Sequence, residues 1–257
     1  TRAALPDEFL EFVGRTGSPA HTVAESKTRL EKAGFERLPE GQPWQLKPGG
    51  RYYVTQDGTS FCAFAVGGSF DPATGGVVMA AAHTDSPCLK LRPFSKLPSK
   101  AGTLQLGVDT YGGGLWHTWF DRPLGVAGTI VVSKKSSKTD ASGGMEQRLV
   151  RITEPVCVIP NLAIHLQNPK EREAFAPNKE KELRPVLCPP CGQGAIAPSE
   201  AASKPAQNTE EQNVSKMWKP HHHSELLSML AKASGVEPEE IIDVDLCLMD
   251  ATPPCIM

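Results

Sequence analysis

Three consecutive residues, His83-Thr84-Asp85, combine the residue types most able to do chemistry in this 257-residue chain. An imidazole can bind a divalent metal through one ring nitrogen while a nearby carboxylate accepts a hydrogen bond from the other. That second bond fixes the tautomer and raises the basicity of the ligand. Asp85 could also bind the metal itself. Alternatively, a buried His83 could pair with an Asp85 that only caps the following turn. The triplet alone leaves these interpretations open.

The residues before the triplet favour a functional site. Residues 77–82 are all apolar. A run that is apolar on both faces predicts a strand buried at the centre of a sheet that is covered on both sides. Open α/β sheets place their sites where such strands end. We therefore expect His83 to lie at the end of a buried strand.

Helices and a hairpin are predicted upstream of this strand. Residues 6–16 predict a short helix with Pro6 in its first turn. Thr22 and Glu25 have capping-box spacing, which predicts a second helix that ends at Gly34. Further on, Asp57-Gly58 separates two strand-like runs, and Asp-Gly is the strongest short signal for a hairpin.

Beyond Pro93 the pattern becomes rich in short strands with Gly and Pro between them, which indicates a separate β unit. Residues 221–233 predict an amphipathic helix ended by Gly235, and residues 241–250 alternate as a half-buried strand. Between Pro93 and the predicted helix, we predict strands at residues 103–111, 126–132, 148–153 and 155–160.

The composition excludes several classes of function. The chain has 27 basic and 29 acidic side chains and a pI near 6.4, so no global field favours nucleic acid or anionic lipid. No apolar run approaches the roughly 20 residues that span a bilayer. The N-terminus lacks the features of a signal peptide. Seven scattered cysteines predict reduced thiols, and hence a cytoplasmic protein.

A second possible metal site involves Cys188 and Cys191. His221, His222 and His223 follow about thirty residues later, so a Cys2His2 zinc site is conceivable. The intervening sequence is rich in Pro, Ser, Ala and Gln, which favours an insertion with two incidental thiols. Adjacent histidines on a helix point in different directions, so we interpret the three as a solvated helix start.

Longer motifs carry a resemblance to a known family. The strings VVMAAAHTDSPCLKLRP, GVDTYGGGLWHTWFDRPLGVAGTIVV and IPNLAIHLQ closely resemble the aspartyl aminopeptidase family of zinc peptidases. The resemblance runs through almost the whole chain and weakens only across residues 188–219. It implies an α/β fold: a peptidase domain, with a sheet sandwiched by helices, is interrupted by an inserted β-rich dimerisation domain. It also implies that dimers assemble into a dodecamer.

The resemblance implies domain boundaries as well. Residues 1–93 would be the N-terminal part of the peptidase domain, and residues 94–240 the inserted dimerisation domain. Residues 188–219 are a low-complexity insertion within it. Residues 241–257 would begin the return into the peptidase domain, which is incomplete here.

Three site residues follow from the resemblance. His83 matches the first zinc ligand, and Asp85 matches the carboxylate that orients it. His165 matches a histidine that reaches a neighbouring subunit's active site, where it would help bind the substrate carbonyl as oxyanion charge develops. From the residues alone, 162–167 alternate as a strand, which favours His165 as an outward polar residue.

Other candidates are rejected. His117 lies between aromatic residues, which favours a packing role. The pairs Glu210-Glu211 and Glu239-Glu240 imitate the family's adjacent glutamates, which supply the catalytic base and a metal ligand. Neither pair follows a strand end, and Glu239-Glu240 comes after Pro238 at a predicted helix start, where acidic side chains favour the helix dipole.

The resemblance therefore implies a metal-dependent aminopeptidase that releases N-terminal Asp or Glu from peptides by zinc-activated water, with two zinc ions per active site in the complete protein. Only His83 of the metal ligands is present, so we expect a truncated portion that is inactive alone. The alternative is a non-catalytic oligomerisation fragment. A third possibility is a related two-metal exopeptidase or deacylase. No nucleic-acid or membrane partner is expected.

Overall fold

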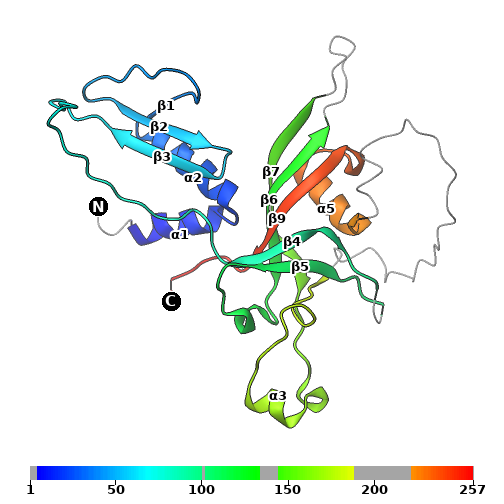
Figure 1. Ribbon diagram of the computed structural model, residues 1–257. Helices are drawn as coiled ribbons and strands as arrows, with labels where there is room; N and C mark the ends of the chain where they lie inside the picture. The colour runs from blue at the N-terminus through cyan, green and yellow to red at the C-terminus, as the bar shows by residue number, and fades with distance from the viewer. Residues whose placement is uncertain (1–4, 100–101, 134–143, 188–220, 257) are drawn as a thin grey trace. The chain divides into compact units, whose positions relative to one another are not determined.

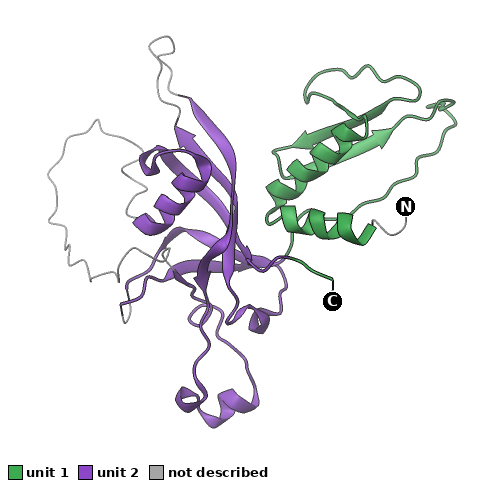
Figure 2. Cartoon of the chain, turned by 180° about the vertical axis from the view of Figure 1, so that it is seen from behind, with its two compact units in different colours: residues 1–86, 254–257 green, residues 87–253 purple. Residues whose placement is uncertain are grey.

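The computed structural model describes residues 5–99, 102–133, 144–187 and 221–256. They form two compact units (Figure 2). The N-terminal unit comprises Thr1–Ser86 and Pro254–Met257, and the β unit comprises Pro87–Pro253. Cys188, Cys191 and the pair Glu210-Glu211 lie outside the described residues. None of the described helices is long and apolar enough to cross a membrane.

Two helices and a three-stranded sheet make up the N-terminal unit (Figure 1). The sheet order is β1-β2-β3. Both residues of the predicted hairpin turn, Asp57 and Gly58, have positive φ angles of 50° and 66°, as a two-residue turn requires. The hairpin prediction is confirmed. The elements are α1 Leu5–Arg15, α2 Pro19–Lys32, β1 Glu36–Arg37, β2 Arg51–Gln56 and β3 Ser60–Ala65.

Helix α2 begins earlier than predicted. Its N-cap is Ser18, whose side chain accepts a hydrogen bond from the backbone N–H of His21, and Pro19 occupies the first turn. Serine at the N-cap followed by proline is a strong start signal, so the predicted capping box of Thr22 and Glu25 is wrong.

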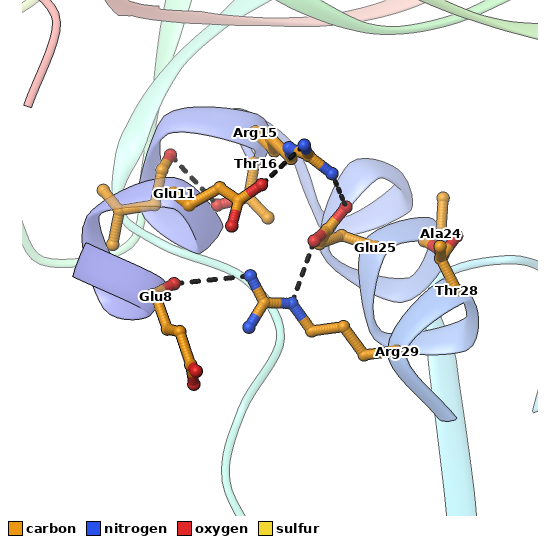
Figure 3. Close-up of polar contacts among 9 residues, drawn as sticks. Glu8, Glu11, Arg15, Thr16, Ala24, Glu25, Thr28 and Arg29 are labelled. Atoms are coloured by element: carbon orange, nitrogen blue, oxygen red, sulfur yellow. Dashed lines mark hydrogen bonds and ion pairs between the residues drawn. The ribbon is translucent and has the colours of Figure 1, made fainter. Parts of the chain in front are cut away.

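Glu25 instead joins α1 to α2 (Figure 3). Its carboxylate lies 2.9 Å from Nε of Arg29 and 3.6 Å from a guanidinium nitrogen of Arg15. Arg29 also donates to the carbonyl oxygen of Glu8 and lies over the ring of Phe12. Because the Glu25 side chain is largely buried, these contacts fix the angle between the two helices more firmly than exposed ion pairs would.

The N-terminal unit buries little apolar surface. Among its described residues, the buried hydrophobic side chains are Val23, Leu38, Tyr52 and Tyr53. Helix α1 has no fully buried residue, and its Leu5, Phe9 and Val13 are exposed.

The predicted buried strand at residues 77–82 is wrong. These residues have no regular structure, and no described strand pairs with them. Val77 and Met79 are 78% and 83% exposed. An apolar run forms a buried strand only where other strands and helices cover it, and the three-stranded sheet of this unit provides no such cover.

The β unit contains a six-stranded antiparallel sheet of order β5-β4-β9-β6-β7-β8 (Figure 1). Helix α5, Ser224–Ser234, packs on it through Leu226, Leu227 and Leu230, which confirms the amphipathic helix. The segment between β7 and β8 extends away from the sheet and carries α3, Pro169–Glu173. The strands are β4 Cys88–Lys96, β5 Leu106–Tyr111, β6 Leu124–Ser133, β7 Met145–Val158, β8 Val186–Leu187 and β9 Ile241–Asp250.

The limits of the two compact units differ from the predicted domain boundaries. Strand β4 begins before Pro93, and β9 pairs with β6 along its length, from Ile241 opposite Val132 to Asp250 opposite Leu124. Residues 241–250 therefore complete the β unit. Alternation along a strand shows that one face is buried, but it does not show which sheet the strand joins.

The three histidines before α5 are not a solvated helix start. His222 is 2% exposed, and its Nδ1 shares a 2.8 Å hydrogen bond with Oγ of buried Ser95 on β4. Nε2 of His223, also buried, donates a hydrogen bond of 3.0 Å to the carbonyl oxygen of Gln105. The ring of His221 packs on Phe94. These contacts dock the start of α5 on the β4–β5 end of the sheet.

Close packing of β6 on β9 predicts a sharp effect of a methyl group. A Cβ at Gly128 would overlap the carbonyl oxygen of Asp245, whereas one at Gly113 would meet nothing within 4 Å. We expect Gly128→Ala to lower the free energy of unfolding of the β unit by about 2–4 kcal/mol, because the clash is with backbone. Gly113→Ala should stay within about 0.5 kcal/mol. Thermal unfolding followed by circular dichroism measures both, and equal effects would contradict the packing.

Burial of His222 predicts acid sensitivity. Desolvation, with repulsion from His221 and His223, lowers its pKa to about 4, and the charge of Asp243 only partly opposes this. Between about pH 6.5 and 4 the unfolded chain therefore binds a proton that the folded protein does not. As the pH falls through this window, the free energy of unfolding should fall by about 1.4 kcal/mol per pH unit. Above the window, this group should not change it.

Denaturant unfolding at a series of pH values tests this expectation. His222→Asn, which can keep a hydrogen bond to Ser95, should flatten the slope between pH 6.5 and 4. The exposed histidine His117 provides the matched control, because His117→Asn should keep the original slope. An unchanged slope in His222→Asn would show that another group causes the acid sensitivity.

Candidate functional site

The structure brings His83 and Asp85 together. Nδ1 of His83 lies 3.0 Å from a carboxylate oxygen of Asp85 and 2.6 Å from its carbonyl oxygen. Between them, the Thr84 hydroxyl donates a 2.9 Å hydrogen bond to the carbonyl oxygen of Thr59, in the turn of the β2–β3 hairpin. The confirmed hairpin therefore holds the triplet that follows the apolar run.

This geometry leaves one ring nitrogen of His83 open. The side chain is 75% exposed, so a buried structural histidine is not what the structure contains. Because Asp85 engages Nδ1, the imidazole presents Nε2 outward, and no described residue forms a hydrogen bond with Nε2. An outward Nε2 with a carboxylate behind Nδ1 is the usual arrangement of a metal-binding histidine.

The described residues do not complete a metal site. Among them, no group of three or more His, Cys, Asp or Glu side chains is arranged to hold a metal ion. Zinc sites use three or four protein ligands, so His83 fits zinc as one ligand of a larger set. The further ligands, the catalytic base and the group that reads the substrate side chain are not found among the described residues.

His165 lies in the β unit, in the segment between β7 and β8. The predicted strand there is wrong, because Ile164–Leu166 form a 3-10 turn. Ile164, His165 and Leu166 of that turn, and Leu162 before it, are all exposed, so no alternation of buried and outward residues exists. Three large apolar side chains around one exposed imidazole are unusual for a free surface.

A cavity of about 390 Å³ adjoins this turn. Leu162 and Gln167, on either side of His165, line it together with Arg184 and an edge-to-face pair of Phe120 and Phe175. Its lining is mixed apolar and polar, which suits the burial of a protein segment.

The rejected candidates have ordinary places in the fold. Glu240 accepts a hydrogen bond from the backbone N–H of Glu237 and so caps the short helix η4, Pro238–Glu240, as the predicted helix start requires. His117 lies in η1, Trp116–Trp119, and is exposed, so its predicted packing role is wrong, whereas Trp116 beside it is buried.

A histidine oriented by a carboxylate is the arrangement of a metal-binding imidazole. Residues 12–257 match the family described as aminopeptidase I zinc metalloprotease (M18). The chain belongs to this family, which confirms the resemblance and the α/β fold class.

Individual relatives agree. The chain is 40% identical over 250 residues to the aspartyl aminopeptidase of Caenorhabditis elegans, covering 97% of this chain and 50% of that one. It is 40% identical over 252 residues to aspartyl aminopeptidase 4 of Saccharomyces cerevisiae, covering 97% and 49%. The chain thus spans about half the length of the curated relatives it matches.

Solved structures match the fold. The structure of the Ape4 and Nbr1 complex matches with a TM-score of 0.78 and 35% identity, covering 96% of this chain and 44% of that one. The structure of the S. cerevisiae mApe1 dodecamer matches with a TM-score of 0.69 and 27% identity, covering 97% and 48%.

Proposed function

We propose that His83 is a zinc ligand of a metal-dependent aminopeptidase that releases N-terminal Asp or Glu from peptides. The observation that carries this proposal is the outward Nε2 of His83, held by the contact of Nδ1 with Asp85. Family membership and relatives named aspartyl aminopeptidases support the reaction and its acidic preference.

Each of the two residues has a separate task. His83 would supply a neutral imidazole nitrogen to the metal, and Asp85 would keep the proton on Nδ1 and the ring in place. Zinc, when bound, supplies a water of lowered pKa and polarises the peptide carbonyl. Because the chain spans about half the length of its relatives, we assign the remaining ligands of a two-zinc site to the part of the relatives that it does not cover.

We assign oligomerisation to the β unit, as the inserted dimerisation domain, and the incomplete peptidase domain to the N-terminal unit. The exposed leucines and isoleucine around His165 support this assignment, because such side chains are normally covered in an assembly. In a dodecamer, His165 would enter a neighbouring subunit's active site and donate to the substrate carbonyl as negative charge develops. One relative has been solved as a dodecamer.

The second candidate is a non-catalytic oligomerisation fragment. Among the described residues, no group of three or more His, Cys, Asp or Glu side chains could hold a metal ion, which favours this candidate for this chain alone. We propose a cytoplasmic location for either candidate, because none of the five described cysteines forms a disulfide. Mass and zinc analysis of the native protein, with hydrolysis of Asp- and Leu-terminal amides, separates the two candidates.

Substitution of His83 and Asp85 in the complete protein tests the metal site. His83→Ala should abolish hydrolysis and reduce bound zinc, because one ligand is lost. Asp85→Ala should lower zinc affinity or activity by about 10- to 100-fold, because the imidazole loses its orienting partner. Zinc content and turnover of Asp-terminal amides are measured, with His117→Ala as the matched control. Normal zinc content and turnover in His83→Ala would remove His83 from the site.

Substitution of His165 tests its role in the reaction. His165→Ala in the complete protein should lower kcat by about 10²- to 10³-fold, because a donor to the developing oxyanion is lost. Zinc content should be unchanged, since His165 is not proposed as a ligand. Native mass should also be unchanged if the residue acts in catalysis. A normal kcat would leave His165 as a surface residue, and a lower native mass would assign it to assembly.

A further inference from the structure

Asp121 has a backbone conformation that few residues adopt. Its φ angle is 58°, and among the residues that the structure describes only one other non-glycine residue, Asp57 in the hairpin turn, has a positive φ. In this left-handed region the Cβ of an L residue crowds the backbone. Such a conformation persists only where surrounding contacts determine it, and positions of this kind cluster at functional sites. The contacts of Asp121 therefore indicate what its conformation serves.

Asp121 holds the chain at the end of β7. Its backbone N–H donates a 2.9 Å hydrogen bond to the carbonyl oxygen of Ile159. Its carboxylate accepts one of 2.9 Å from the backbone N–H of Asn161. Ile159 is fully buried, whereas residues 161–166 are exposed. Asp121 thus clamps the chain at the point where it leaves the core for the segment that carries His165.

Hydrogen bonds continue from Asn161 through residues 161–167, which we call the His165 loop. The side-chain amide of Gln167 donates to the side-chain oxygen of Asn161 at 3.4 Å and to the carbonyl oxygen of Leu162 at 2.8 Å. These bonds join the two ends of the loop. No described residue forms a hydrogen bond with the imidazole of His165. The backbone of the loop, held at Asn161 by Asp121, is therefore what directs the ring.

The residue after Asp121 fixes this clamp to the sheet. Arg122 forms an ion pair of 2.6 Å with Asp250 at the end of β9. Its Nε donates a 2.7 Å hydrogen bond to the carbonyl oxygen of Thr118 in η1. Asp121 is thus attached to the central strand of the β unit on one side and to the root of the His165 loop on the other.

We propose that Asp121 is a positioning residue for His165. Its carboxylate and its left-handed backbone set the place and direction of the His165 loop, so that the imidazole is presented to a substrate carbonyl. This inference rests on the proposed function of His165 and assigns Asp121 no contact with substrate or metal. Precise placement matters because a displacement of about 1 Å at a reacting group costs about 10²-fold in rate.

Two substitutions separate the carboxylate from the backbone conformation. Asp121→Gly accepts the φ angle of 58° and removes the acceptor for the Asn161 N–H, whereas Asp121→Asn tolerates the same angle and keeps a side-chain oxygen. Both leave in place the edge-to-face contact of Phe120 with Phe175, which holds the far limb of the segment. Asp71→Gly is the matched control, because its exposed carboxylate also accepts a backbone N–H but belongs to the N-terminal unit.

Amide hydrogen exchange of the complete protein, followed by mass spectrometry, tests the clamp independently of activity. In Asp121→Gly, peptides from the His165 loop should exchange about 10-fold faster than in the parent protein, because the loop opens more often. Peptides from β7 should be unchanged. Asp121→Asn and Asp71→Gly should exchange like the parent. Parental exchange of the loop in Asp121→Gly would overturn the proposal. Faster exchange of β7 as well would also overturn it, by assigning Asp121 to general stability.

Turnover of Asp-terminal amides by the complete protein tests the consequence for the reaction. In Asp121→Gly, kcat should fall about 10-fold, less than in His165→Ala, with KM and zinc content unchanged. Asp121→Asn should recover most of this loss. In the His165→Ala background, Asp121→Gly should cause no further loss, because no imidazole remains to be positioned.

The outcomes separate this inference from the proposed function on which it rests. A low kcat in His165→Ala with a normal kcat in Asp121→Gly would overturn the positioning role alone. Equal losses from Asp121→Gly with and without His165 would also overturn it. A normal kcat in His165→Ala would reject the proposed function of His165, and the exchange measurement then decides by itself whether Asp121 holds the His165 loop.

Discussion

The pairing of β9 between β4 and β6 is the interaction on which most of the described structure depends. It unites β4 and β5 with β6, β7 and β8, and it places the fully buried Leu246 in the core on which α5 packs. Gly128 on β6 permits the close approach to the β9 backbone. Because β9 follows the other strands in the chain, the sheet can close only once residues 241–250 are available. Through β7 and β8, the same sheet anchors the segment that carries His165.

The N-terminal unit has a different energetic balance. Its helices are joined by the contacts of Glu25 and its hairpin by the turn at Asp57-Gly58, but few of its apolar side chains leave water. Burial at about 25 cal/mol per Å² is the main favourable term in folding, and residues 77–82 contribute almost none of it here.

Several predictions succeeded because they rest on neighbours in the chain. The hairpin turn needs only two residues that tolerate positive φ, and helix α5 needs only apolar residues at helical spacing. The contact of His83 with Asp85 joins residues two positions apart. The capping box at Thr22 failed even though it is local, because Ser18-Pro19 is a better start a few residues earlier. The strand predictions at 77–82 and 162–167 failed because strands need partners that a sequence window does not contain.

The sequence by itself therefore determined the turn, the amphipathic helix, the histidine–carboxylate pair and, through long motifs, the family. Only the tertiary structure decided that β9 belongs to the β unit and that His222 is buried against Ser95. The physical reason is the range of the interactions. Turn, cap and helix energies depend on residues within a few positions, whereas burial and sheet order depend on which distant segments meet.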